Sequence, residues 1–338
     1  MVLELTAPFR IDVHCHHIPD FYRLALAGQG ILTAGGIPIP PWSPTSAVVF
    51  MTEFGIQTQI VSISEPGVGF LPTAVARRDM ARRVNDYTMA EMVNSANPLL
   101  KGRFGGFAVL PIGPLTPTDV QNSCDEATRA LTTLGMDGIG LFSAYEGAYL
   151  GDPRLDPLMR VLNDHRAVVF VHPVTPVKYP DLHLPTFLYE FTFDTTRAAV
   201  NMAYRQIYTR FPNIRWIFAH AGGTLPYVAG RVRMALDQPD LVRGFNPDTF
   251  NEANLDFGRH YYDTALSPAP ASMKAVRTLT DVSHILFATD YPFAGPVFVV
   301  PGDPAPQFKD TFSASERKSV ERSNALALFP RVAARVGK

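Results

Sequence analysis

Eight short apolar runs, separated by longer helix-like stretches, are the feature that most limits what this chain can fold into. Most of them are continuously apolar, as in VVFVH, IRWIFAH and HILFATD. Continuous apolar runs are typical of strands buried on both faces, as in a parallel sheet. The predicted strands cover residues 9–13, 59–64, 104–110, 138–142, 167–172, 214–220, 260–264 and 285–290.

The stretches between these strands predict helices and therefore an α/β fold. Apolar residues at helical spacing predict helices over 74–97, 118–134, 157–165, 195–210 and 313–329, with Thr118 as a cap. Eight strands alternating with helices predict a (β/α)8 TIM-type barrel, which typically needs about 250 residues. The surplus falls in insertions at 28–44, 174–190 and 294–306, which leave the C-terminal face. We expect one domain over 1–338. A doubly wound open sheet is the rival, but no glycine-rich phosphate-binding motif follows the first strand.

Composition excludes several classes of function. The 338 residues are 46% hydrophobic and carry a formal net charge of −1 without charged blocks. We therefore expect no nucleic-acid partner and no membrane-surface partner. No apolar run approaches the roughly 18 residues of a membrane span, and the first residues, MVLELTAPFR, show no secretory signal. Two cysteines are too few for a disulfide framework, so a cytoplasmic location is expected.

Polar side chains stand where four of the predicted strands end. His14 and His16 end the first strand, His172 the fifth, His220 the sixth and Asp290 the eighth. Residues i and i+2 of a strand share a face, so His14 and His16 project together. Imidazoles and a carboxylate that meet at one end of a barrel suit a divalent ion such as Zn²⁺, with Mn²⁺ or Fe²⁺ as alternatives. A four-coordinate metal ion needs fewer ligands than these five candidate residues, so one of the five could act as an acid or base that does not bind the metal.

Each of these residues has an ordinary alternative. His14 and His16 fit surface histidines in a polar turn, and His220 before Ala-Gly-Gly fits a tight strand-to-loop turn. His172 before Pro173 fits a strand-end histidine bonded to backbone, and Asp290 fits a helix cap. The joint occurrence on four strand ends is what favours a site.

The arrangement resembles the amidohydrolase superfamily, whose pattern is HxH after strand one, His on strands five and six, and Asp on strand eight. The segments RIDVHCHHIPDFY, VVFVHP, FDTTRAAVN, FAHAGGTLPYVAGR, YYDTA and ATDYPF are similar to its decarboxylase branch, typified by aminocarboxymuconate semialdehyde decarboxylase, and are most similar to the 6-methylsalicylate decarboxylases. Strand four reads GIGLFSAY, without the bridging lysine of two-metal relatives. The resemblance therefore implies a single metal, Zn²⁺ or Mn²⁺.

The resemblance also implies roles for individual residues. His14, His16, His172 and Asp290 would bind the metal, and Asp290 and His220 are both candidates to deliver a proton. Arg231 would reach a neighbouring subunit's site and bind the substrate carboxylate, which implies a homodimer with shared active sites. Residues expected to line the pocket are Ser143, Tyr145, Phe193, Asp194, Asp263 and Phe293; position alone suggests Trp42 as part of a lid.

The implied reaction is the non-oxidative decarboxylation of a small aromatic carboxylic acid, a 2-hydroxybenzoate such as 6-methylsalicylate. The product would be 3-methylphenol with CO2. The alternative is a mononuclear metal-dependent hydrolase of a lactone, amide or ester, in which Asp290 would be the general base. A barrel that has lost its metal and only binds a ligand is a third hypothesis.

Overall fold

A barrel of eight parallel strands forms the centre of the computed structural model, which describes residues 6–238, 240, 252–297, 300 and 302–337. The sheet order is β1-β4-β5-β6-β9-β10-β11-β12. These strands are β1 (Arg10–His16), β4 (Ile56–Ser62), β5 (Phe104–Val109), β6 (Gly138–Phe142), β9 (Val168–His172), β10 (Arg215–Phe218), β11 (Tyr261–Asp263) and β12 (Ile285–Leu286). The predicted (β/α)8 architecture is confirmed.

The barrel closes between β1 and the segment that follows β12. Val13 N donates to Phe287 O at 3.1 Å, His16 N to Tyr291 O at 2.7 Å, and Asp290 N to His14 O at 2.7 Å. The predicted eighth strand, 285–290, is therefore too long. The sheet ladder ends at Leu286, and residues 287–290 bend toward β1 because their backbone groups pair there.

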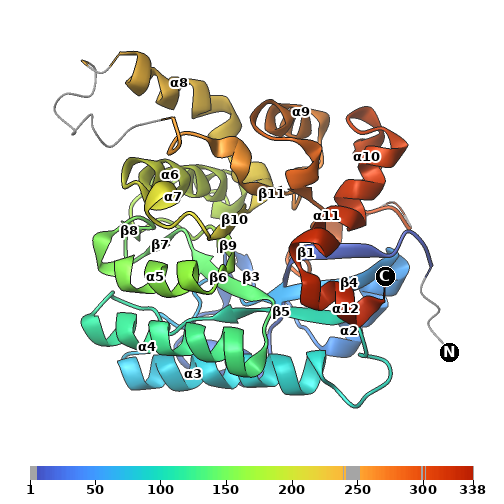
Figure 1. The fold of residues 1–338 in the computed structure, drawn as a ribbon. Helices are drawn as coiled ribbons and strands as arrows, with labels where there is room; N and C mark the ends of the chain where they lie inside the picture. The colour runs from blue at the N-terminus through green and yellow to red at the C-terminus, as the bar shows by residue number, and fades with distance from the viewer. Residues whose placement is uncertain (1–5, 239, 241–251, 298–299, 301, 338) are drawn as a thin grey trace.

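Helices cover the outside of the strands, as Figure 1 shows. They are α1 (Asp20–Gly28), α2 (Pro44–Glu53), α3 (Ala74–Tyr87), α4 (Pro117–Arg129), α5 (Asp156–Asp164), α6 (Glu190–Tyr204), α7 (Ile207–Arg210), α8 (Leu225–Asp237), α9 (Pro270–Leu279), α10 (Ala314–Lys318), α11 (Asn324–Leu328) and α12 (Pro330–Val336). None of the described helices is both long and apolar enough to cross a membrane.

Local chemistry explains where several helices begin and end. The cap of α4 is Thr116, not Thr118 as predicted; its hydroxyl accepts from Asp119 N at 3.2 Å, and Pro117 takes the first helical position. The predicted helix 195–210 starts earlier, at Glu190, and breaks at Gln206, which has a φ of +59°. A further helix that was not predicted, α12, follows the predicted last helix, 313–329.

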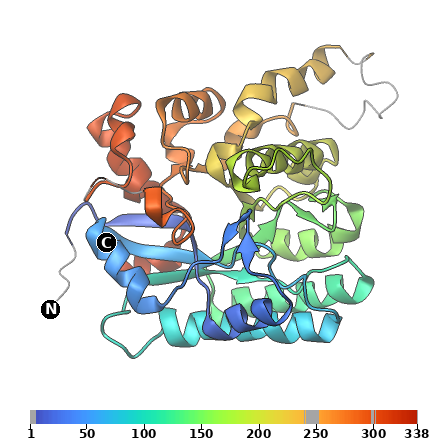
Figure 2. The same ribbon diagram turned by 180° about the vertical axis from the view of Figure 1, so that it is seen from behind.

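The insertions build the face that carries the candidate site. The segment 28–44 follows α1 rather than β1 directly, and forms the hairpin of β2 (Thr33–Ala34) and β3 (Ile37–Pro38). Figure 2 brings this blue hairpin to the front of the strands. A second hairpin, β7 (Ala144–Tyr145) and β8 (Ala148–Tyr149), follows β6. Of the insertion 294–306, residues 298–299 and 301 lie outside the described residues.

Candidate active site

Four side chains from three places in the barrel converge on one point. His14 and His16 come from β1, His172 ends β9, and Asp290 follows β12. His14 Nε2 lies 3.2 Å from His16 Nε2, and Asp290 Oδ1 lies 3.4 Å and 3.1 Å from these two nitrogens. One donor atom from each of the four residues lies within 4.8 Å of the others, and all four residues are buried. Three imidazoles and a carboxylate at this spacing can hold a divalent metal ion.

Each histidine of this cluster is oriented by a partner on its Nδ1 atom. His14 Nδ1 lies 2.8 Å from Asp263 Oδ2, His172 Nδ1 lies 2.7 Å from its neighbour's carbonyl, Pro173 O, and His16 Nδ1 lies 3.3 Å from Ser62 Oγ. A partner on Nδ1 leaves the Nε2 lone pair to bind a metal. The donor set therefore fits a metal ion in distance, and in the tautomer that carries its proton on Nδ1 each histidine can offer Nε2 as the ligand atom.

The charges around the cluster favour a cation at its centre. Burial opposes a charge on His14, but Asp263 and Asp290 outweigh burial and raise the pKa of His14 to about 10. Burial and the neighbouring imidazoles lower the pKa of His172 well below its usual value. Burial would raise the pKa of Asp290, yet His14 and His16 hold it well below its usual range. Two carboxylates thus stabilise one positive charge between them, which suits a metal ion equally.

His220 lies beside the cluster and is held by different contacts. Its ring centroid is 4.9 Å from that of His14 and 6.1 Å from that of His172. His220 Nδ1 lies 3.0 Å from Ala265 O, and its backbone N donates to Asp263 Oδ1 at 2.9 Å. Burial, followed by the charge of His14, lowers the pKa of His220. His14, His220 and Asp263 form a second group of possible ligands that shares His14 with the first.

The two residues expected to handle the proton have an unusual backbone. His220 has a φ of +54° and Asp290 a φ of +61°, in the left-handed region that residues other than glycine seldom occupy. Hydrogen bonds from His220 N to Asp263 and from Asp290 N to His14 O hold them there. Strain maintained by surrounding contacts is typical of functional sites. With this backbone conformation, the Asp290 side chain points at His14 and His16 and does not cap a helix.

Asp12 is a buried residue whose role the sequence did not suggest. Its carboxylate accepts from His14 N at 3.2 Å, from Gln59 Nε2 at 3.1 Å, and from Thr289 N and Oγ1 at 3.1 and 2.6 Å. Burial raises its pKa to about 7, against the effect of these hydrogen bonds. Asp12 therefore ties the strand that carries two histidines to the segment that carries Asp290.

A sequence profile of the amidohydrolase family matches residues 11–331, nearly the whole chain. The chain belongs to the amidohydrolase family. The chain is 32% identical to the 6-methylsalicylic acid decarboxylase of Penicillium expansum, over 96% of this chain and 97% of that protein.

Solved structures share the fold of this amidohydrolase. A crystal structure described as an amidohydrolase II is 25% identical, has a TM-score of 0.79, and is matched over 94% of this chain and 99% of that one. The dihydroxybenzoic acid decarboxylase of Polaromonas, solved with manganese and 2-nitroresorcinol, is 21% identical with a TM-score of 0.73, over 95% and 96% of the two chains. Both matches agree with the barrel described above.

The ligand cluster of this amidohydrolase opens into an apolar cavity of about 230 Å³, called here the catalytic cavity. His172, Asp290 and Ser64 supply its polar lining, and none of the described lining residues is cationic. Its apolar wall includes Ile37, Phe187, Phe191, Leu266, Phe293 and Val297. A mostly apolar cavity with a few polar groups suits a small ring that carries polar substituents.

The structure places the expected lining residues in different environments. Phe293 lines the catalytic cavity, and its ring lies 5.6 Å from that of His16. Ser143 does not line it, because its hydroxyl points away and donates to Asp194 Oδ2. Phe193 is 43% exposed and also lies outside the lining; Phe191, two residues earlier, takes that place. Asp263 lies outside the lining and contacts His14 Nδ1 and the backbone N of His220.

Two further expectations concern residues at the edge of the site. Trp42 is buried, with its ring 6.0 Å from that of His17, so it packs in the core and forms no part of the cavity wall. In the same insertion, Gly35 and Ile37 of the hairpin line the catalytic cavity instead. Arg231 is exposed on α8, where it lies outside this chain's own cavity.

Proposed function

We propose that this amidohydrolase is a metal-dependent decarboxylase that converts a 2-hydroxybenzoate, specifically 6-methylsalicylate, to 3-methylphenol and CO2. The observation that carries the proposal is the cluster of His14, His16, His172 and Asp290 opening into an apolar cavity sized for one ring. The similarity to the Penicillium expansum enzyme supports the choice of substrate.

The chain's own donor set supports one divalent ion, held by His14, His16, His172 and Asp290. When bound, such an ion would bind the carboxylate and ortho hydroxyl of the substrate and stabilise the developing negative charge. Manganese is favoured by the Polaromonas structure, and zinc by the abundance of imidazole ligands. The metal assignment here is therefore Mn²⁺ or Zn²⁺.

The residues of the catalytic cavity bind and orient the ring. Phe191 and Phe293 supply flat apolar contact for the ring. When the bond between ring and carboxylate breaks, its electron pair stays on the ring carbon, that carbon takes up one proton, and CO2 leaves. The candidates to deliver the proton are Asp290, which lines the cavity and is also a candidate ligand, and His220, whose ring lies 6.1 Å from that of the cavity residue His172.

Several features of the whole protein belong to the same proposal. We infer a single domain over 1–338, a cytoplasmic location and a homodimer in which Arg231 of one subunit reaches the substrate carboxylate in the other. The exposure of Arg231 on α8 supports this last inference, because that side chain is available to a second subunit.

The test is to incubate the metal-loaded protein with 6-methylsalicylate in D2O and to measure CO2 and phenol. We expect one equivalent of each, with one deuterium on the ring carbon that carried the carboxylate. Esters, lactones and amides are tested in parallel. Hydrolysis of one of these without CO2 release from any 2-hydroxybenzoate would overturn the proposal in favour of the hydrolase.

A further inference from the structure

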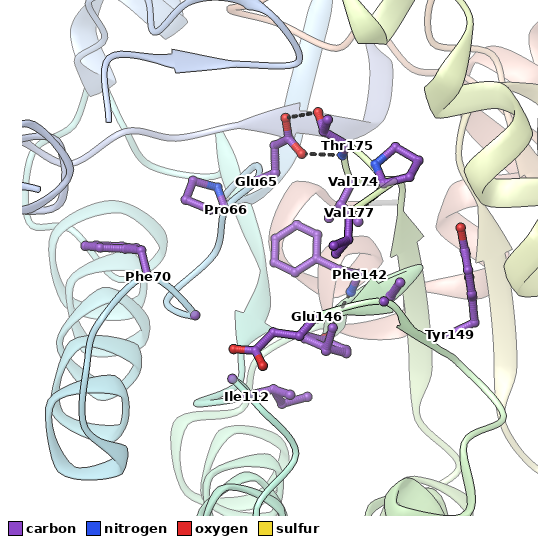
Figure 3. Close-up of a pocket in the computed structure, with 16 residues that line it drawn as sticks. Glu65, Pro66, Phe70, Ile112, Phe142, Glu146, Tyr149, Val174, Thr175 and Val177 are labelled. Atoms are coloured by element: carbon purple, nitrogen blue, oxygen red, sulfur yellow. Dashed lines mark hydrogen bonds between the residues drawn. The ribbon is translucent and has the colours of Figure 1, made fainter. Parts of the chain in front are cut away.

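A second cavity, of about 250 Å³, lies against the catalytic cavity; it is called here the outer cavity. Neighbouring residues of the chain line the two cavities. Ser64 and His172 line the catalytic cavity, whereas Glu65 and Val174 line the outer cavity. Figure 3 shows the ring of Phe142, which lines the outer cavity, between the Glu65–Thr175 pair and Glu146. The cavities therefore share a wall.

The shared wall is made of side chains and not of a continuous sheet. Glu65 accepts from Thr175 N at 2.6 Å, from Thr175 Oγ1 at 3.0 Å and from Gly35 N, and Gly35 itself lines the catalytic cavity. The ring centroid of Phe142 lies 6.2 Å from that of His172. A few loop hydrogen bonds and one aromatic ring thus separate the outer cavity from the metal-ligand cluster.

The outer cavity is built to hold an aromatic ring. Its wall contains Phe70, Phe142, Tyr145 and Tyr149. Tyr149 Oη donates to Asp194 Oδ1 at 2.6 Å, and Tyr145 Oη accepts from Phe142 N at 3.0 Å, so both tyrosine rings are held in place. Rings fixed before binding lose little entropy when a ligand arrives.

The charge of the outer cavity selects among aromatic ligands. Two carboxylates, Glu65 and Glu146, line it, and none of its described lining residues is Lys, Arg or His. An aromatic acid would bring a further negative charge to a cavity lined by carboxyl groups, without a cation to balance it, which is unfavourable at a partly buried site. A neutral phenol would instead donate its O–H to a carboxylate.

We propose that the outer cavity is a binding site for a neutral phenol, the decarboxylated product, next to the catalytic cavity. The inference rests on the proposed function, because loss of CO2 turns an anionic acid into a neutral phenol. The acid is retained at the cationic metal centre, while the phenol loses that attraction and gains a favourable site across the shared wall. Charge alone thus separates product from substrate.

Calorimetry on the metal-loaded full-length protein tests this without turnover, using 3-methylphenol and its anionic counterpart 3-methylbenzoate. Val177 lines the outer cavity and is 68% exposed, so Val177→Trp fills the space at little risk to folding. We expect Val177→Trp to weaken 3-methylphenol binding about tenfold or more. Leu182→Trp, in the same loop, 56% exposed and outside the lining, is the matched control and should bind as the wild type does.

A charge reversal gives the second arm. Glu146→Lys places a cation in the outer cavity, so a second equivalent of 3-methylbenzoate should bind in addition to that at the metal; Glu53→Lys on α2 should add none. Unchanged 3-methylphenol affinity in Val177→Trp, or no added benzoate equivalent in Glu146→Lys, would overturn the proposal. Both readouts are independent of CO2 release, so they separate this proposal from the decarboxylase assignment.

Discussion

At the scale of single residues, the candidate site is a set of ligand atoms each held by a second group. Asp263 orients His14, the Pro173 carbonyl orients His172, and Ser62 orients His16. Partners of this kind hold the ring orientation and raise metal affinity. Loss of one ligand should therefore lower metal binding and turnover together. Loss of a nearby catalytic group that is not a ligand should lower turnover and leave metal binding intact.

His172→Ala is expected to lower bound metal and decarboxylation in parallel, with metal affinity reduced at least about 100-fold. Elemental analysis of the purified variant and a CO2-release assay measure the two effects. His165→Ala, an exposed histidine just after α5, is the control and should retain both. Full metal content in His172→Ala would remove His172 from the ligand set.

Asparagine substitutions distinguish the roles of His220 and Asp290. Asparagine tolerates the positive φ at both positions, so the backbone should be preserved. We expect His220→Asn to keep its metal and to lose about 10²- to 10⁴-fold in kcat, the contribution typical of a general acid or base. Asp290→Asn should lose metal and turnover. A His220→Asn variant as metal-poor as His172→Ala would instead make His220 a ligand.

At the scale of elements, one buried histidine outside the candidate site stands at the start of a barrel strand. His260 stands just before β11, is 2% exposed, and packs 4.2 Å from the ring of Tyr208 and 5.6 Å from that of Phe218. Its Nε2 has no hydrogen-bond partner among the described residues. Burial, with smaller effects of Arg259 and His284, lowers its pKa to about 3.

This environment makes the stability of the fold depend on pH. Below about pH 6.5 the unfolded chain binds a proton at His260 that the folded chain does not, so the free energy of unfolding falls as the pH falls. The expected loss is about 1.4 kcal/mol per pH unit for this group, or about 2 kcal/mol from pH 6.5 to 5.

Urea unfolding of wild type and His260→Phe at both pH values measures the effect. Phenylalanine fills the same aromatic site without titrating, so the variant should lose about 2 kcal/mol less than the wild type over this range. His183→Phe, at an exposed histidine, is the control and should follow the wild type. Equal pH dependence in wild type and His260→Phe would contradict a neutral buried His260.

At the scale of the whole molecule, closure of the barrel brings the first and last strands together, and with them His14, His16 and Asp290. In contrast, α8 packs loosely: only Leu225 of this helix is buried, and Tyr227 is 89% exposed. Figure 1 shows α8 standing out from the other helices. This position is the one from which Arg231 is proposed to reach a second subunit.

Arg231→Ala is expected to raise KM for 6-methylsalicylate about tenfold or more with little change in folding, because a charged hydrogen bond to the carboxylate is lost. Mixing Arg231→Ala with His172→Ala subunits tests sharing of the site. A mixed dimer would contain one site with intact ligands and the partner's Arg231, so wild-type KM should return. A mixture that keeps the raised KM, or a protein that sediments as a monomer, would exclude a shared site.

The sequence by itself determined the strands of the barrel and singled out four residues whose possible ligand atoms the structure brings together. Strand predictions such as 138–142 agree with the structure because a short, continuously apolar run is typical of a strand that is buried on both faces of a parallel sheet. His14, His16, His172 and Asp290 stood out because they stand at the ends of such runs, and parallel strands deliver their ends to one face.

Only the tertiary structure decided which side chains support and surround that cluster. Asp12 and Glu65 look like ordinary acidic residues in the sequence, and their roles come from donors supplied by distant segments, Thr289 for one and Gly35 and Thr175 for the other. The hydroxyl of Ser143 likewise finds its partner in a distant segment, at Asp194, and does not line the cavity. Hydrophobic periodicity reports which face of an element is buried, but hydrogen-bond partners and cavity walls depend on how the loops of separate strands pack together.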